Sequence, residues 1–190
     1  MLKKSLGVLL CSCAMASGAQ ADEVELALTE ETLQGWYIMD SARVGVEGGD
    51  LSLGLLLSDE RDIVAQAGLM IPGLATDVGM GPISVRFGAR AYGALLADPD
   101  DDVFGIAPGV EARFALPTGI PMTAVGNIFY APDIVTFGEA DDIVDFNARL
   151  EIQFVEQITG FAGFRLLTFD RDFGEDDVVE NIQLGVRFGF

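Results

Sequence analysis

The sequence predicts an all-β fold, an antiparallel transmembrane β-barrel of ten strands. Short segments in which apolar and polar residues alternate follow one another from residue 22 onward, and a period of two is typical of a β-strand because successive side chains leave opposite faces. The most apolar window, residues 68–85, contains Pro72, Pro82 and Asp77, which excludes a membrane helix. An even strand number also returns both chain ends to one side of the membrane, as single-chain barrels require.

Residues 1–21 are predicted to be a secretory signal peptide, which leaves residues 22–190 as the barrel domain. The chain begins with a basic segment containing Lys3 and Lys4, continues through a short apolar run, and reaches the small-x-small sequence Ala19-Gln20-Ala21. We therefore expect export and insertion into the outer membrane of a Gram-negative cell envelope. Lipoprotein processing at Cys13 is an alternative, because residues 10–13 loosely resemble a lipobox.

The mature chain is strongly acidic and contains no Cys, Lys or His. Nine arginines stand against 30 acids, which gives a net charge of −21. This charge argues against nucleic acid as an electrostatic partner. A chain without Cys and His can form no disulfide framework, and it lacks the imidazole on which most nucleophilic catalysis depends. We therefore expect no enzymatic activity and no cofactor.

Five strands are predicted in the first half of the mature chain. They are alternating segments bounded by turn residues, over residues 24–29, 32–46, 51–57, 63–71 and 83–92. In the second of them, the pair Asp40-Ser41 predicts a bulge or bend. In the fifth, Arg86 and Arg90 share one face. The fourth is expected to end at Pro72-Gly73.

Five more strands are predicted in the second half, over residues 104–114, 122–130, 144–154, 159–169 and 178–190. The clearest is Val144–Phe154, in which six apolar residues on one face oppose five polar residues on the other. Eleven residues is about the length that a tilted strand needs to cross a bilayer, and this alternation indicates a lipid-facing outer side and a polar interior.

Acidic residues concentrate in the turns at one end of the predicted barrel. With both termini in the periplasm, five turns lie outside the cell and hold 18 of the 30 acids: residues 30–31, 58–62, 97–102, 131–142 and 170–177. On the other side, residues 72–81 would form a long periplasmic turn, so an eight-stranded barrel is kept as the fallback. The acidic turns are either solvated surface or a weak divalent-cation site, with Asp100, Asp101 and Asp102 as candidates.

Charged residues on the polar faces predict the contents of the barrel interior. Arginine on the lipid face would cost about 2–4 kcal/mol near the midplane, so these side chains must point inward. The predicted inward charges are Arg86, Arg90, Glu111, Arg113, Asp145, Arg149, Glu151, Arg165 and Arg187, with Gln183 beside them. We expect Glu111 to lie between Arg86 and Arg90, and Glu151 beside Arg165. The set is either a charged plug or, because Arg is in excess, a narrow pore that prefers small anions.

Aromatic residues near the strand ends predict the girdles that mark the two membrane interfaces. The expected girdles are Phe114, Phe154, Phe188 and Phe190 on one side and Tyr92, Phe104, Tyr130 and Phe169 on the other.

The last strand resembles the C-terminal signal of bacterial outer-membrane barrels. Gln183, Gly185, Phe188 and Phe190 match its order of a polar residue, a glycine and two hydrophobic residues that end in Phe. The resemblance implies that the barrel assembly machinery reads this strand. Outer-membrane lipid and lipopolysaccharide are the other expected partners, and we expect a monomer.

Signal peptide, length, strand order and the C-terminal Phe together resemble the YfaZ family of small outer-membrane proteins. The most local match is Ile128-Phe129-Tyr130-Ala131-Pro132-Asp133, where that family has an aromatic strand end that runs into Ala-Pro-Asp. The resemblance implies a structural or narrow porin-like barrel and supplies no catalytic residues. The alternative is a soluble periplasmic β-barrel that turns the same apolar faces inward to bind an apolar ligand.

Overall fold

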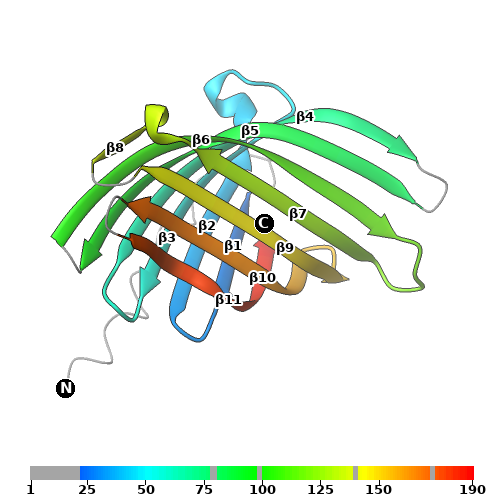
Figure 1. Cartoon of the computed structure of the whole chain (residues 1–190). Helices are drawn as coiled ribbons and strands as arrows, with labels where there is room; N and C mark the ends of the chain where they lie inside the picture. Colours follow the sequence, from blue (N-terminus) through cyan, green and yellow to red (C-terminus); the bar gives the residue numbers. More distant parts are fainter. Residues whose placement is uncertain (1–21, 78–80, 98–99, 139–140, 172–173) are drawn as a thin grey trace.

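The computed structural model describes residues 22–77, 81–97, 100–138, 141–171 and 174–190, which form a closed antiparallel β-barrel (Figure 1). The predicted signal peptide lies outside the described residues. Ten strands make the barrel wall: β1 (Glu23–Leu28), β2 (Thr32–Asp40), β3 (Asp50–Ser58), β4 (Ile63–Asp77), β5 (Pro82–Ala97), β6 (Asp100–Leu116), β7 (Met122–Ala131), β9 (Asp142–Val155), β10 (Ile158–Arg171) and β11 (Gly174–Gly189). The predicted ten-stranded barrel is confirmed.

The wall closes where the first and last strands pair: β1 pairs with β11, with Val24 opposite Phe188. β7 pairs with β9, and Ala131 lies opposite Ile143. The segment between β7 and β9 contains a short 3-10 helix, η2 (Asp133–Val135), and the strand β8 (Thr136–Gly138), which pairs with β6. The two ends of the described barrel, Asp22 and Phe190, which we call its termini, meet. Asp22 N–H donates to Phe190 O at 3.1 Å, and Phe190 N–H donates to Asp22 O at 3.0 Å.

The second strand ends earlier than predicted. It stops at Asp40, and a 3-10 helix, η1 (Ser41–Val44), follows in place of the expected continuation to Val46. The Asp40 side chain accepts a hydrogen bond from Ala42 N–H, and the helix ends at Gly45 in the left-handed conformation with φ of 85°. Asp is a strong N-cap residue and Gly a strong C-cap residue. The local sequence therefore terminates the strand where a bend had been expected.

The predicted long turn after residue 71 is mostly strand. β4 continues to Asp77, and its register against β5 shifts between Pro72 and Leu74. Pro72 lacks a backbone N–H, so it is tolerated at an irregularity of this kind, and Gly73 lies beneath the Phe87 ring, where a Cβ would come within 2.5 Å of Cε2. The same is true of two predicted acidic loops, because β6 already includes Asp100–Asp102 and β11 begins at Gly174.

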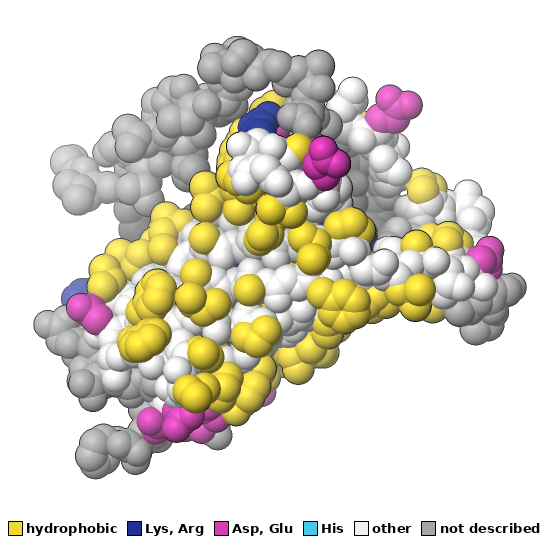
Figure 2. All heavy atoms as spheres, turned by 90° about the horizontal axis from the view of Figure 1, so that it is seen from above, with side chains coloured by type: hydrophobic (Ala, Val, Ile, Leu, Met, Phe, Trp, Pro, Cys, Tyr) yellow, Lys and Arg dark blue, Asp and Glu magenta, His cyan; other side chains and the backbone are white. Residues whose placement is uncertain are grey.

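Hydrophobic side chains cover much of the outer wall of the barrel, and in the view of Figure 2 acidic side chains lie toward its edges. Leu53, Ile106, Ile182 and Leu184 are among the large exposed hydrophobic residues. The soluble alternative requires the opposite orientation, with these faces turned inward. Within the described residues, neither short helix has the length or apolar character needed to cross a membrane.

Two predicted girdle aromatics lie inside the barrel. Tyr92 and Phe169 are fully buried, and the Tyr92 hydroxyl donates to Asp145. Each has the strand parity of interior neighbours: Tyr92 lies two residues from Arg90 and Phe169 four residues from Arg165. Phe104, Tyr130, Phe154, Phe188 and Phe190 are exposed, as girdle residues would be, and Phe114 is half-buried.

Candidate functional site in the barrel interior

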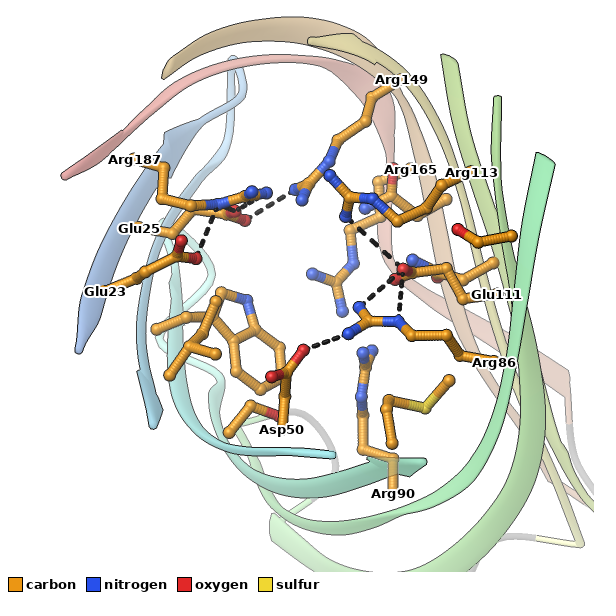
Figure 3. Close-up of a pocket in the computed structure, with 17 residues that line it drawn as sticks. Glu23, Glu25, Asp50, Arg86, Arg90, Glu111, Arg113, Arg149, Arg165 and Arg187 are labelled. Atoms are coloured by element: carbon orange, nitrogen blue, oxygen red, sulfur yellow. Dashed lines mark hydrogen bonds and ion pairs between the residues drawn. The ribbon is translucent and has the colours of Figure 1, made fainter. Parts of the chain in front are cut away.

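A cavity of about 390 Å³ opens inside the barrel and is surrounded by charged side chains (Figure 3). Its mouth lies near the chain termini, where the Glu23 and Asp50 side chains remain 40% and 42% exposed. Its floor lies deeper, where Arg165 is only 3% exposed. Exposure to solvent therefore falls from the mouth of the cavity to its floor. We call the ion pairs near the mouth the upper network, formed by Glu25, Asp50, Arg86, Glu111, Arg113, Arg149, Glu151 and Arg187.

In the upper network each buried carboxylate is shared by two or three guanidinium groups. Glu25 accepts from Arg149 at 2.7 Å and from Arg187 at 2.9 Å. Glu151 accepts from Arg113 at 2.6 Å, from Arg187 at 2.7 Å and from Arg149 at 2.8 Å. Three of these contacts join strands that are not neighbours in the sheet: Arg149 to Glu25, Arg113 to Glu151 and Arg187 to Glu151. Charge-assisted hydrogen bonds are stronger than neutral ones, so these contacts brace the wall.

The third carboxylate of the upper network, Glu111, faces Arg86 directly across β5 and β6. Arg86 Nη2 donates to Glu111 at 2.7 Å, and Arg86 also donates to Asp50 of β3. Glu111 contacts Arg113 at 3.5 Å. Arg90 instead points to the floor, so Glu111 does not lie between Arg86 and Arg90 as expected.

The floor is organised around Asp145, which is fully buried. Its Oδ2 accepts from Arg90 at 2.6 Å, from Tyr92 at 2.8 Å and from Arg165 at 2.9 Å. Arg165 also donates to the amide oxygens of Gln34 and Gln66. Arg165 therefore pairs with Asp145 in place of the expected Glu151. Cross-strand register places Arg165 opposite Asn147, and Glu151 opposite Phe161.

Aromatic rings hold the floor arginine Arg90 on two sides. Its guanidinium carbon lies 4.8 Å from the centroid of the Trp36 ring and 4.1 Å from that of Phe129. Cation–π contacts of this kind gain strength when they are desolvated. Arg90 is therefore fixed by one carboxylate and two rings at the base of the cavity.

Beyond the floor, an apolar layer fills the interior at the end opposite the termini. Its members flank the turns at that end of the barrel, as Leu56 and Val64 do on either side of residues 59–62. All are buried, and the largest are Tyr92, Phe129 and Phe169. The layer consists of Leu56, Val64, Tyr92, Ala94, Leu96, Val103, Ala107, Phe129, Ala131, Ile143, Leu167, Phe169, Val178 and Val179. Met70, which lines the cavity, belongs to the same cluster of buried hydrophobic residues. Packed side chains leave no room for water at protein density.

The eight residues predicted to line the lumen all carry side chains in the networks around this cavity. Seven of them line the cavity directly, and the eighth, Glu151, contacts three of its arginines. The seven are Arg86, Arg90, Glu111, Arg113, Arg149, Arg165 and Arg187. The structure adds Glu23, Glu25 and Asp50, which sequence reasoning missed. Glu23 and Glu25 alternate with Val24 and Leu26, so the period of two could have identified them.

The added acids change the charge balance of the interior. Six arginines around the cavity face six acids: Glu23, Glu25, Asp50, Glu111, Asp145 and Glu151. The expected excess of positive charge along the wall is therefore missing from the described interior.

The four residues of the C-terminal signal occupy different faces of β11. Gln183 is buried inside the barrel, where its amide donates to Asn147 at 2.9 Å, whereas Phe188 and Phe190 are exposed on the outer side. A Cβ on Gly185 would lie 2.2 Å from Phe161 Cζ. Gly185 therefore provides the space that the interior Phe161 ring occupies across the strand pair.

The acidic cation candidates do not form a cluster within the part of the chain that is described. Asp102 is exposed on β6, and the side chains of Asp100 and Asp101 lie outside the described residues. Among described residues, no group of three or more acidic, His or Cys side chains has a geometry that could hold a metal ion.

Comparison with known proteins places the chain in context. The family model described as "YfaZ precursor" matches residues 3–190. No curated protein sequence matches the chain. Among solved structures, a bacterial polysaccharide outer membrane secretin is similar at 12% identity and a TM-score of 0.46, over 88% of this chain and 69% of that one. A KdgM porin is similar at 10% identity and a TM-score of 0.44, over 90% of this chain and 99% of that one.

Proposed function

The chain belongs to the YfaZ precursor family, and from this premise we propose that it is a small, exported outer-membrane β-barrel with a structural role. In this proposal the barrel has no enzymatic activity and is closed to the passage of solutes. The outward position of the apolar strand faces supports the membrane placement. In a closed barrel every backbone polar group can be paired within the wall, which is the condition for crossing a bilayer with strands.

The apolar layer is the observation that carries the closed state. A conducting pore needs a continuous path of polar or hydrated surface, but the layer contains fully buried rings and branched aliphatic side chains from nearly every strand around the barrel. Opening a path through it would require several of these side chains to leave their packed positions. Such a movement is unfavourable because it gives up the van der Waals attraction between packed atoms and leaves a cavity behind.

The upper network and the floor support the structural role. They connect opposite parts of the wall with charge-assisted hydrogen bonds, as when Arg149 of β9 reaches Glu25 of β1. The balance of six positive and six negative groups also removes the basis for a narrow pore that prefers anions. The interior thus combines ion pairs that join the strands of the wall with the apolar layer, which we call the seal because it closes the lumen.

Single-barrel recordings in planar lipid bilayers test the closed state. The mature protein, refolded in detergent and inserted, is expected to give no stepwise current, whereas the double variant Phe129→Ala with Phe169→Ala removes the two phenylalanine rings of the seal and is expected to conduct. Regular current steps from the wild-type barrel would overturn the proposal. Heat-modifiable gel mobility of both proteins verifies that each barrel has folded.

Membrane placement has its own test. We expect the mature protein in the outer-membrane fraction of cells, with lipid and lipopolysaccharide around its wall, as a monomer assembled by the machinery that reads β11. The outward exposure of Phe188 and Phe190 supports this last point, because residues that a receptor reads must be accessible. Recovery of the folded protein from periplasmic extract without detergent would contradict it.

A further inference from the structure

The floor of the cavity contains buried polar atoms that the proposed structural role does not explain. Buried polar atoms normally have hydrogen-bond partners, and each one that lacks a partner carries a desolvation cost. Among the described residues, four buried nitrogen donors of the floor have none: Nε of Arg90, Nε of Arg165, and Nε2 of Gln34 and Gln66. Two acceptors in the same region, one oxygen each of Asp145 and Asn127, are also unpartnered. Donors outnumber acceptors at this depth.

The floor also carries an excess of positive charge. Like the excess of hydrogen-bond donors, this charge favours a negatively charged ligand. Among the described residues, Arg90 and Arg165 form ion pairs with one carboxylate, that of Asp145, so the floor carries one positive charge in excess. Glu25 also attracts Arg165 but already pairs with Arg149 and Arg187. The buried acids of the upper network are already occupied by arginines of their own, as Glu151 is by three. The cavity is neutral as a whole, but its charges are separated along its depth.

The surroundings of the floor strengthen its attraction for a negative group. Trp36 and Phe129 lie against Arg90, and Arg165 is almost fully buried, so few water dipoles screen either guanidinium. Electrostatic attraction between a buried charge and its partner grows as the local dielectric constant falls. Figure 3 shows the guanidinium groups of Arg90 and Arg165 directed into the cavity from opposite sides, with that of Arg86 between them in this view.

From these observations we propose that the cavity is a closed-ended binding site for one small monovalent anion, of the size of a halide or acetate, held at the floor by Arg90 and Arg165. The anion enters from the end where the chain termini meet, because the apolar layer closes the other end. A single negative charge balances the floor and supplies acceptors for its free donors. The closed end of the site rests on the proposed closed state of the barrel, whereas the binding of an anion at the floor is tested independently of it.

The only tryptophan of the chain reports on this site. Trp36 lines the cavity and its ring contacts Arg90, so its fluorescence senses any quencher that reaches the floor. Iodide, an anionic quencher, is expected to give a Stern–Volmer constant several-fold larger than caesium, a cationic one, for the refolded barrel in neutral detergent. Equal constants for the two ions, or no quenching by iodide, would overturn the proposal.

Competition distinguishes binding from random collision. Sodium acetate is expected to lower the iodide constant along a saturating curve, whereas a polymeric carboxylate at the same sodium concentration is too large for the cavity and is expected to leave it unchanged. If both salts act equally, ionic strength alone explains the effect and the site does not exist.

Two variants change the floor charge in opposite directions. Arg90→Gln is expected to lower the iodide constant several-fold, and Asp145→Asn, which removes the competing carboxylate, is expected to raise it. Arg61→Gln is the matched control, because Arg61 is exposed in the turn between β3 and β4 and loses the same charge far from the cavity. A variant that fails to show heat-modifiable mobility is set aside, and the other decides. The same iodide constant in the folded variants and the wild type would refute the assignment of the site to the floor.

Discussion

Arg149 of β9 donates a hydrogen bond to Glu25 of β1 at 2.7 Å. The bond crosses the interior of the barrel, because β10 and β11 lie between these two strands in the wall. The two residues are 124 positions apart in the sequence. Arg187 joins the same carboxylate from β11, and the Arg149 guanidinium lies 4.5 Å from the centroid of the Phe161 ring of β10. One acidic residue near the N-terminus therefore connects the beginning of the barrel to its last three strands.

Removal of the Glu25 charge should destabilise the barrel. Glu25→Gln leaves Glu151, which Arg113 also contacts, as the one buried carboxylate among the described residues that Arg149 and Arg187 still share. Breaking a buried ion pair costs about 3–5 kcal/mol. Urea unfolding in lipid vesicles, followed by fluorescence, measures the change. Glu23→Gln is the control on the same strand. The Glu23 side chain is 40% exposed and its contact with Arg187 is 3.6 Å, so its loss should cost less than about 1 kcal/mol. Similar losses of unfolding free energy for the two variants would contradict the stabilising role of the buried Glu25 ion pairs.

A charge on the outer wall tests the orientation of the strands toward lipid. Leu184 is 61% exposed on the outer face of β11, and Leu184→Arg should reduce the stability of the barrel in vesicles by about 2–4 kcal/mol. The same change at Ile134, which is exposed in η2 between two strands, should cost little because an arginine there reaches water. If Leu184→Arg folds as stably as the wild type in lipid, that face does not contact acyl chains.

Gly185 should be required for folding itself, in addition to any role in recognition by the assembly machinery. A Cβ there would lie 2.2 Å from the Phe161 ring and 2.5 Å from Leu26 O, so Gly185→Ala must displace the ring or the neighbouring strand. We expect Gly185→Ala to refold poorly into detergent without any cellular factor. Gly189→Ala is the control, because no heavy atom lies within 4 Å of the added Cβ. Normal refolding of Gly185→Ala would leave recognition as the reason for the glycine.

The contacts of the Asp22 side chain with Tyr37 of β2 and Arg43 of η1 should give the barrel an acid-sensitive component of stability. A hydrogen bond from Tyr37, helped by Arg43 at 2.8 Å, lowers the pKa of the Asp22 carboxyl below its ordinary value of 3.8, against the opposing effect of burial. Because the folded state binds the proton more weakly than the unfolded state, this stabilisation is complete above the ordinary pKa and is lost as the pH falls through the lower folded pKa.

Asp22→Asn should therefore lower the free energy of unfolding near neutral pH, and the difference from the wild type should shrink once the pH falls below the folded pKa. Urea unfolding at a series of pH values measures that difference. Tyr37→Phe should reproduce part of the effect, because it removes the largest cause of the pKa shift. A difference that stays constant with pH would exclude Asp22 as the titrating group.

The alternation of residues along each strand was sufficient to predict ten strands, their faces and the inward position of the arginines. This information is local, because a strand exposes alternate residues to opposite sides whatever its partners are. The caps of η1 and the irregularity after Pro72 were also visible in the sequence, but the predicted boundaries missed them. A proline-glycine pair indicates a turn or a bulge equally well, and only the pairing of β4 with β5 decides between them.

Only the tertiary structure decided what the interior side chains meet. Alternation places Tyr92 and Arg90 on the same face, but it does not say how far along the barrel axis each one lies or which residue faces it from the opposite wall. Those depend on the register of strands that meet through closure, such as β1 with β11. Register and closure together separated the interior into an apolar layer and a charged cavity, and they placed Asp145 between Arg90 and Arg165. The sequence alone could not predict this, because these interactions join residues that are distant in the sequence.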